Sequence, residues 1–167
     1  MYKRQPYAPV SELQEKYGSP NPKGLMEYIS TCKREFKPQT KFQYSCLNYI
    51  TLQHIIETIT GQSLRDFAKE NIFDILGMQY TDYLPTIQQQ DGKWINTVAC
   101  PWMDRIAPTE KQKDGSVLCG QVHDPLARIL NGGISGNAGI FSNANDIGIL
   151  AAALLNGGEY NGRRILS

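Results

Sequence analysis

The stretch FQYSCLNYITLQHIIETITG at residues 42–61 decides the fold of this 167-residue chain. Its apolar residues recur at intervals of three and four, the spacing that places side chains on one face of an α-helix. Gly61 follows at the point where a left-handed residue ends such a helix, a conformation that glycine adopts without strain. The expected buried face consists of Tyr49, Leu52, Ile55, Ile56 and Ile59.

A second helix is expected directly after this turn. Ser63 fits an N-cap, and Asp66 three residues later fits a capping box, in which hydroxyl and carboxylate each accept from an unpaired backbone N–H. Gly77 ends this helix. Residues 44–78 therefore predict a helical pair, and the apolar face of its second helix comprises Leu64, Phe67, Ala68, Ile72 and Ile75.

The flanking regions have less regular patterns. Five prolines interrupt residues 1–43, so an irregular lead-in is expected, with a short helical patch around Leu25–Cys32. Residues 79–123 contain the turn dipeptides Asp91-Gly92 and Asp114-Gly115 between extended runs, a pattern that predicts a hairpin excursion.

Residues 124–167 predict two helices joined by a glycine-rich loop. Asp124-Pro125 resembles an N-cap followed by proline at the first helical position, and Gly132-Gly133 ends that short helix. The last helix begins near Asn143 and is stopped by residues 156–158. Its expected buried side chains are Ile147, Leu150, Ala151 and Leu154.

Composition excludes several classes of protein. Basic and acidic residues nearly cancel, 17 against 16, so nothing favours nucleic acid as a partner. No apolar run approaches the roughly 18 residues of a membrane helix, and the first residues lack the pattern of a signal peptide. The four cysteines, Cys32, Cys46, Cys100 and Cys119, are too sparse for a disulfide scaffold and wrongly spaced for zinc.

Other chemical sites find little support in the residues. The glycines between 132 and 139 fit neither a P-loop nor a dinucleotide fingerprint, so tight turns or close backbone approach explain them better. His54 and His123 have no neighbouring ligand pattern, and no metal site is expected. A Ser-His-Asp triad stays open, because triads assemble from distant positions, although no G-x-S-x-G elbow supports one.

Tyr44 stands just before the amphipathic helix, on a connection constrained by Pro38. A tyrosine transfers protons near neutral pH only where nearby cations lower its pKa from about 10. The residues alone therefore favour a structural aromatic.

Several blocks in order resemble the serine β-lactamase and penicillin-binding-protein superfamily. Residues 42–61 resemble F-x-Y-S-N followed by I-I-E and T-G, and residues 71–81 resemble I-F-x-P-L-G-M-x-x-T. Residues 108–110, 120–124 and 138–142, and the ending at 155–162, match later blocks. The resemblance covers roughly residues 36–167. It implies an α+β, mainly helical, transpeptidase-like fold of which this chain is the central part, lacking most of the sheet.

The resemblance also implies site residues. The family uses a serine nucleophile in S-x-x-K, a tyrosine in Y-x-N and a K-T-G or H-T-G strand. Tyr44 takes the tyrosine role, and Cys46 stands where the asparagine belongs. A thiol lacks the paired donor and acceptor of an amide, so substrate binding by Cys46, with Asn48 nearby, departs from the pattern.

The other two motifs are missing. Ser30-Thr31-Cys32-Lys33 matches S-x-x-K literally, but it lies only 14 residues before Tyr44 (44 − 30) and is interpreted as coincidence. No K-T-G or H-T-G follows. The expectation is a single partial domain over 1–167, a fragment of a serine hydrolase acting on a β-lactam, a peptidoglycan peptide or an ester, inactive alone and without cofactors.

Alternatives remain. The segment could be a non-catalytic cell-wall or protein-binding module, which Cys46 favours, or a plain helical domain without a site. Family resemblance implies an exported or periplasmic location. Apolar surface meant for the missing sheet would allow a homodimer.

Overall fold

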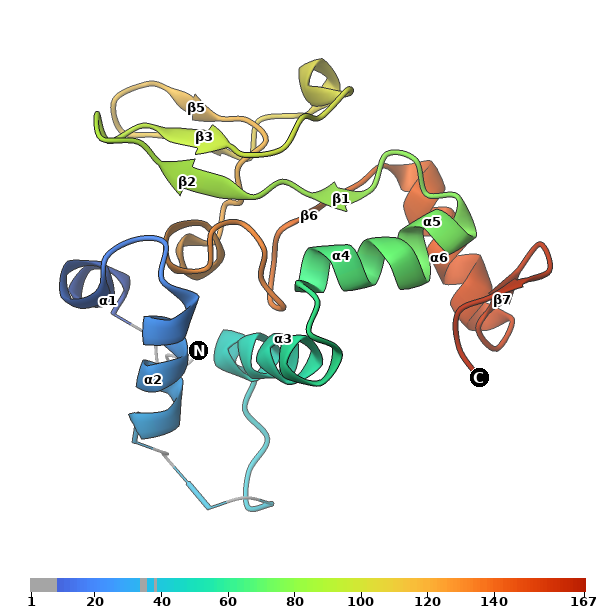
Figure 1. Cartoon of the computed structure of the whole chain (residues 1–167), viewed down its shortest axis with the longest axis horizontal. Coiled ribbons are helices and arrows are strands. Elements are labelled where there is room, and N and C mark those ends of the chain that lie inside the picture. Colours follow the sequence, from blue (N-terminus) through green and yellow to red (C-terminus); the bar gives the residue numbers. More distant parts are fainter. Residues whose placement is uncertain (1–8, 34–35, 38) are drawn as a thin grey trace.

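The helical pair expected from residues 44–78 is present. A computed structural model describes residues 9–33, 36–37 and 39–167 (Figure 1). Helix α3 (Cys46–Thr60) begins after Ser45, whose Oγ accepts from Leu47 N, and ends at Gly61 in the left-handed conformation, with φ of 70°. The predicted bounds are therefore confirmed within a few residues.

The second helix of the pair is continuous but not uniform. It comprises α4 (Leu64–Ala68), the π-helical turn η1 (Lys69–Phe73) and α5 (Asp74–Leu76). Ser63 Oγ accepts from Asp66 N at 3.1 Å and donates to the Asp66 carboxylate at 2.7 Å, so the expected capping pair forms. Gly77 ends the helix with φ of 72°.

The prediction of an irregular lead-in over 1–43 is wrong for most of the described part. Helix α1 (Val10–Tyr17) and helix α2 (Pro22–Thr31) occupy it, and α2 contains the predicted patch. Two of the prolines lie at the borders of these helices: Pro9 precedes α1, and Pro22 is the first residue of α2, where its missing N–H costs nothing.

The expected hairpins form around their Asp-Gly turns. Strand β2 (Thr86–Gln88) pairs antiparallel with β3 (Trp94–Asn96), and β4 (Glu110–Lys111) pairs with β5 (Val117–Leu118). A 3-10 turn, η2 (Met103–Arg105), lies between the hairpins. Figure 1 shows them together above the helices.

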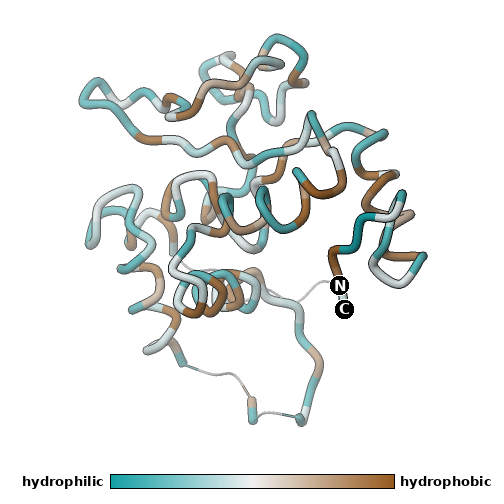
Figure 2. The backbone as a smooth tube through the Cα atoms, turned by 45° about the vertical axis from the view of Figure 1, so that its right-hand side comes forward, coloured by the Kyte–Doolittle hydropathy of each residue, from teal (hydrophilic) through white to brown (hydrophobic). Residues whose placement is uncertain are grey.

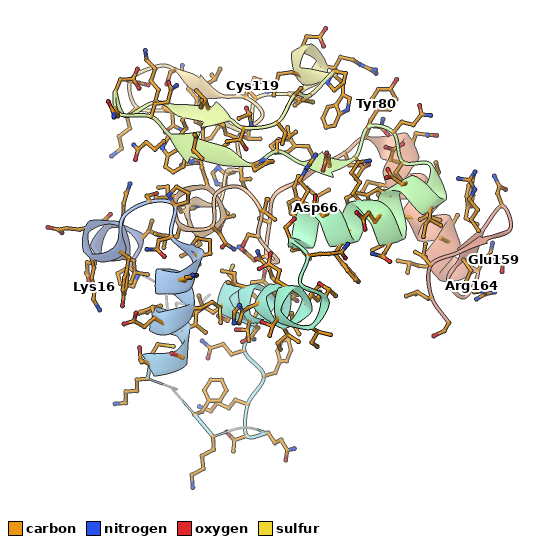
Figure 3. The ribbon with its side chains drawn as sticks, viewed as in Figure 1. Lys16, Asp66, Tyr80, Cys119, Glu159 and Arg164 are labelled. Atoms are coloured by element: carbon orange, nitrogen blue, oxygen red, sulfur yellow. The ribbon has the colours of Figure 1, made fainter. Side chains whose placement is uncertain are left out.

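Two further pairs of strands were not expected. β1 (Asp82–Tyr83) pairs with β6 (Ile140–Phe141), which brings the end of the helical pair to the glycine-rich loop. β7 (Glu159–Tyr160) and β8 (Arg163–Arg164) form the last hairpin, closed by the Arg164–Glu159 ion pair at 2.6 Å (Figure 3).

The C-terminal helices follow their predicted caps. Asp124 Oδ1 accepts from Ala127 N at 2.9 Å and begins η3 (Leu126–Leu130), which has π-helical geometry. Asn143 caps α6 (Ala144–Leu155) by accepting from Asp146 N at 2.8 Å.

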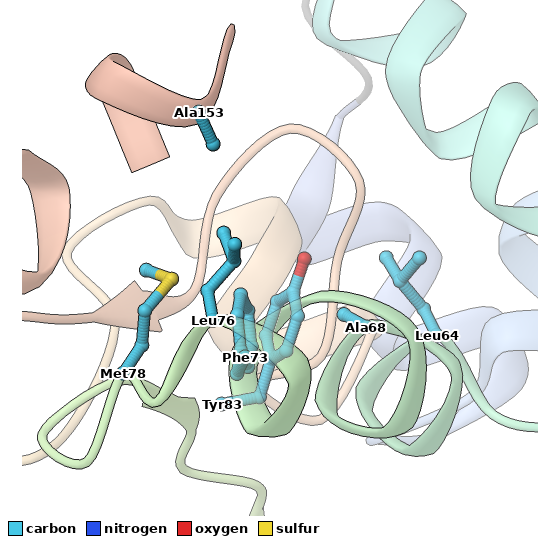
Figure 4. Packing of buried hydrophobic residues seen from close by; sticks show 7 residues of the cluster. All are labelled: Leu64, Ala68, Phe73, Leu76, Met78, Tyr83 and Ala153. Atoms are coloured by element: carbon cyan, nitrogen blue, oxygen red, sulfur yellow. The ribbon is translucent and has the colours of Figure 1, made fainter. Parts of the chain in front are cut away.

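Buried side chains form two clusters. The first joins α1, α2, α3 and η3 through Leu13, Leu25, Leu47, Ile50, Leu126 and Leu130. The second gathers around the second helix of the pair and includes Ala153 of α6 (Figure 4). Its members are Leu64, Ala68, Phe73, Leu76, Met78, Tyr83 and Ala153.

The prediction of which face of α3 is buried is wrong. Leu52 is 54% exposed and Ile59 is 78% exposed, and Tyr49 and Ile55 are exposed as well. The buried residues of α3 are instead Leu47, Ile50 and Gln53. Only Ile56 of the predicted face packs on a core cluster. The apolar residues predicted for this face are present along α3, as Figure 2 shows, but most of the face is open to solvent.

A similar correction applies to α6. Ile147 and Leu154 are half exposed and Ala151 is exposed, whereas Asp146 and Ala153 are buried. The carboxylate of Asp146 decides this orientation, because its Oδ2 accepts from Tyr80 N at 2.7 Å and from Thr81 Oγ1 at 2.8 Å. These bonds hold the polar first turn of α6 against the end of the helical pair.

Within the part of the chain that the structure describes, no helix has the length and apolar character to cross a membrane.

Replacing Asp146 by alanine should lower the free energy of unfolding by about 3 kcal/mol, because the N–H of Tyr80 and the hydroxyl of Thr81 lose a charged, buried acceptor. Urea denaturation followed by circular dichroism measures the change. Asn145→Ala, on the exposed side of the same helical turn, is the matched control and should cost at most about 0.5 kcal/mol. Equal losses in the two variants would contradict the role given to Asp146.

Candidate active site

Tyr44 lies on the connection that enters α3, one residue before the N-cap Ser45. Its side chain is 46% exposed, and its ring packs against that of Tyr49 with centroids 5.5 Å apart and an angle of 42° between the planes. The phenol is therefore held at the amino-terminal end of α3 while remaining open to solvent.

Cys46 is the first residue of α3 and is brought to Tyr44. Its Sγ lies 3.9 Å from Tyr44 Oη, within reach of a hydrogen bond donated by the thiol. Asn48 is exposed, and its side chain makes no hydrogen bond within the described part of the chain. The structure thus joins Tyr44 with Cys46 through a hydrogen bond, in which Asn48 takes no part.

The surroundings of Tyr44 raise the pKa of its phenol rather than lowering it. The hydrogen bond with Cys46 is the largest cause, followed by the electrostatic effect of the Cys46 side chain. Slight desolvation and the charges of Tyr49 and Asp124 act in the same direction. The cations that would lower the pKa of Tyr44 are thus not supplied by the described residues, and the phenol stays protonated at neutral pH.

The literal S-x-x-K motif has the wrong geometry for a nucleophile. Ser30 lies near the end of α2, is exposed, and donates from Oγ to the carbonyl of Glu27 at 2.8 Å. The family's serine stands at the start of a buried helix. Because Ser30 is exposed at the opposite end of a helix, the structure supports the interpretation of this motif as coincidence.

The glycine-rich loop packs directly behind α3. A Cβ on Gly136 would lie 2.1 Å from the carbonyl oxygen of Tyr49, so only glycine fits there, as close backbone approach predicts. Gln53 Oε1 accepts from Gly136 N at 3.0 Å and from Asn131 Nδ2 at 2.8 Å. Sequence reasoning missed Gln53, whose only signal was a polar residue within an apolar helix.

Neither histidine is hydrogen-bonded to a serine among the described residues, as a Ser-His-Asp triad would require. His54 is exposed on α3, and His123 Nδ1 lies 3.5 Å from the carboxylate of Glu110. Arg128 Nη1 donates to the carbonyl of His123 at 3.0 Å and also approaches Glu110, at 3.7 Å. His123 thus belongs to a polar contact between β4 and η3.

Metal ligands and disulfides are not assembled in the described residues. No three of their histidine, cysteine, aspartate and glutamate side chains are grouped to hold a metal ion. All four cysteines are unpaired thiols and partly buried.

The sequence profile of the Beta-lactamase family matches residues 3–167, almost the whole chain. The chain belongs to the Beta-lactamase family. Among its relatives is a provisionally named D-alanyl-D-alanine carboxypeptidase of Escherichia coli (strain K12), 35% identical over 147 residues. That match covers 81% of this chain and 31% of the relative. A relative of the same provisional name from Salmonella gallinarum is 30% identical and is matched over 96% of this chain and 37% of its own length.

The fold agrees with this family. An octameric penicillin-binding protein homologue from Pyrococcus abyssi superposes with a TM-score of 0.52 at 18% identity, over 92% of this chain and 28% of that chain. The expected α+β, mainly helical, penicillin-binding-protein-like fold is therefore confirmed. This Beta-lactamase family chain spans about a third of the length of the curated relatives it matches.

Replacing Cys46 by alanine should lower the pKa of Tyr44 toward its ordinary value of about 10, because the largest influences that raise it are removed. An NMR pH titration of the chain labelled with 13C at the tyrosine Cζ measures the pKa directly. Cys119→Ala, which removes a thiol bonded to the carbonyl of Ile106, is the control and should leave Tyr44 unchanged. An unaltered Tyr44 titration in Cys46→Ala would show that the thiol does not act on the phenol.

Proposed function

We propose that this chain is the central part of an acyl-serine hydrolase in which Tyr44 transfers protons. The observation that carries the proposal is the place of Tyr44: an accessible phenol at the entry of α3, in a chain of the Beta-lactamase family. The serine and lysine of S-x-x-K and the K-T-G or H-T-G strand would come from residues outside this chain.

Proton transfer explains why Tyr44 would depend on those residues. A serine hydroxyl is a poor nucleophile until a base removes its proton. A phenol serves as that base only when a neighbouring cation favours its ionised form, and every influence on Tyr44 within the described residues raises its pKa. A lysine ammonium supplied from outside the chain would lower the pKa of Tyr44 by favouring its ionised form. The chain alone would therefore be inactive.

The substrate we favour is a peptidoglycan-type peptide. Support comes from the relatives, whose provisional names are D-alanyl-D-alanine carboxypeptidase. A β-lactam or a simple ester would use the same acyl-serine chemistry. A peptidoglycan substrate implies an exported or cell-envelope protein, and no cofactor is needed. Cys46 and Asn48 would line the substrate side of Tyr44, with Cys46 giving weaker amide recognition than asparagine.

A binding module is the second candidate. Cys46 at the asparagine position of Y-x-N and the raised pKa of Tyr44 both favour a scaffold that has lost its chemistry. Such a module would bind cell-wall peptide or protein without turnover.

The exposed apolar face of α3 supports self-association of the isolated chain. Tyr49, Leu52, Ile55 and Ile59 are all between 42% and 78% exposed, and Phe42, on the connection before the helix, is 97% exposed. The 15 residues of α3 include one glutamate and no lysine or arginine, so two copies of this face would not repel one another. We therefore propose a homodimer through α3.

A grafted enzyme tests the hydrolase proposal. This chain would replace the aligned segment of the 35% identical Escherichia coli relative, which supplies the remaining two thirds. The graft should be acylated by a fluorescent penicillin, and Tyr44→Phe should slow acylation about 100-fold, the usual contribution of proton transfer. The isolated chain should show no labelling. Stopped-flow fluorescence measures the rates.

The control in the graft is Tyr49→Phe, which removes the hydroxyl of the neighbouring ring. Equal rates for Tyr44→Phe and the parent graft would overturn the catalytic role of Tyr44. A folded graft that is never labelled but still binds peptidoglycan peptides would instead favour the binding module. Labelling of the isolated chain that disappears in Ser30→Ala would identify Ser30 as the nucleophile.

Glutamates at Leu52 and Ile59 should dissociate the homodimer, because each would bury a charge in an apolar interface. Light scattering after size exclusion should give twice the monomer mass for the parent chain and the monomer mass for the double variant. The double variant Gln89→Glu and Gln90→Glu adds the same two charges on the β2–β3 hairpin and should remain dimeric. A monomeric parent chain would refute this interface.

A further inference from the structure

A cavity of about 830 Å³ lies between α2 and α3, on a different face of α3 from the exposed apolar residues. Its lining includes Lys23 and Met26 of α2, Ile50, His54 and Glu57 of α3. The two helices lie next to one another in Figure 1. Cavities that hold small molecules measure about 300–1,000 Å³. Neither Tyr44 nor Cys46 lines this one, so it is separate from the candidate active site.

The charges in this cavity do not neutralise each other. Lys23 and Glu57 both line it, yet neither takes part in an ion pair within 4 Å among the described residues. Opposite charges that face one space without touching leave room for a ligand that carries both signs. An ammonium or N–H would meet Glu57, and a carboxylate would meet Lys23.

Two acceptors in the cavity have unused hydrogen-bonding capacity. Asn131 is 5% exposed; its Nδ2 donates to Gln53 and Ser135, while its Oδ1 accepts no bond from the described residues. Glu57 Oε1 accepts from Leu64 N and from Gln53 Nε2, which leaves Oε2 without a described donor. A ligand with N–H groups would supply the donors that these oxygens lack.

The carboxylate end of the cavity is formed by the first turn of α2. Asn21, Pro22 and Lys23 all line it, and the ammonium of Lys23 and the helix dipole favour an anion at that position. His54 adds an imidazole that makes no side-chain hydrogen bond with the described residues. Ile50 and Met26 supply apolar contact for short aliphatic side chains.

We propose that this cavity binds the free end of a short peptide, with the carboxylate at Lys23 and the first turn of α2, and the N–H or ammonium at Glu57 and Asn131. A dipeptide of small residues carries both features. Binding here is independent of acyl-serine chemistry, because no residue of the Tyr44 site takes part.

An NMR titration of the full 167-residue chain with L-alanyl-L-alanine tests the proposal. Saturable shifts should appear at Lys23, His54 and Asn131, with a dissociation constant of about millimolar for so small a ligand. Alanyl-alaninamide, which lacks the carboxylate, and N-acetyl-alanyl-alanine, which lacks the ammonium, should each bind about fivefold more weakly.

The Lys23→Gln variant tests whether the carboxylate of the dipeptide lies at Lys23. It should weaken binding of the dipeptide about fivefold and leave binding of the amide unchanged, since the amide has already lost that contact. Lys113→Gln, an exposed lysine on the β4–β5 turn, is the matched control and should change neither. Met26→Trp should fill the cavity and abolish the shifts, whereas Tyr44→Phe should preserve them.

Equal affinities for the three peptides, equal effects of Lys23→Gln on dipeptide and amide, or shifts confined to Tyr44 and Cys46 would each overturn this site. Absence of shifts up to the solubility limit of the dipeptide, in a chain whose spectrum shows it folded, would also overturn it. None of these outcomes depends on acylation, so the hydrolase proposal stands or falls separately.

Discussion

The side-chain amide of Gln53 is the contact on which the arrangement of this chain depends. It is 6% exposed on α3, and its four bonds reach Glu57, the carbonyl of Ile134, Asn131 and the N–H of Gly136. A buried amide is stable only when its donors and acceptor are paired, so α3 and the glycine-rich loop must stay in register. The same register sets the entry of α3, where Tyr44 lies, and the wall of the α2–α3 cavity.

The backbone of the glycine-rich loop is shaped so that it can lie against α3. Gly136 allows the loop to lie against the carbonyl of Tyr49, and the β1–β6 pair holds the far end of the loop beside the helical pair. Asp146 fixes α6 to the same region through Tyr80 and Thr81. The bonds of Gln53 to the loop, the β1–β6 pair and the bonds of Asp146 thus each join segments that are distant in sequence. They orient the helices and the loop, and the two apolar clusters stabilise that arrangement.

The exposed face of α3 and the protonated state of Tyr44 have one common explanation. Apolar residues at helical spacing are normally buried, yet Leu52 and Ile59 meet solvent, and a tyrosine in this role needs a cation that the described residues do not supply. Both deficits fit a chain that spans about a third of its relatives. Under the proposal that this chain is the central part of a longer hydrolase, the neighbours of α3 and the cation beside Tyr44 would both come from the rest of that enzyme.

The sequence by itself determined what is local. The bounds of α3, the Ser63–Asp66 cap and both Asp-Gly hairpins were predictable, because each rests on residues within a few positions of one another. Helix α1 and the first turn of α2 were not predicted, because the prolines beside them were interpreted as breaks in a helix rather than as its borders. The tertiary structure alone decided which faces of α3 and α6 are buried, since helical spacing shows that a face is apolar but not what covers it. It also decided the role of Gln53 and placed Lys23 and Glu57 around one cavity, because both arrangements join segments whose distance no local pattern encodes.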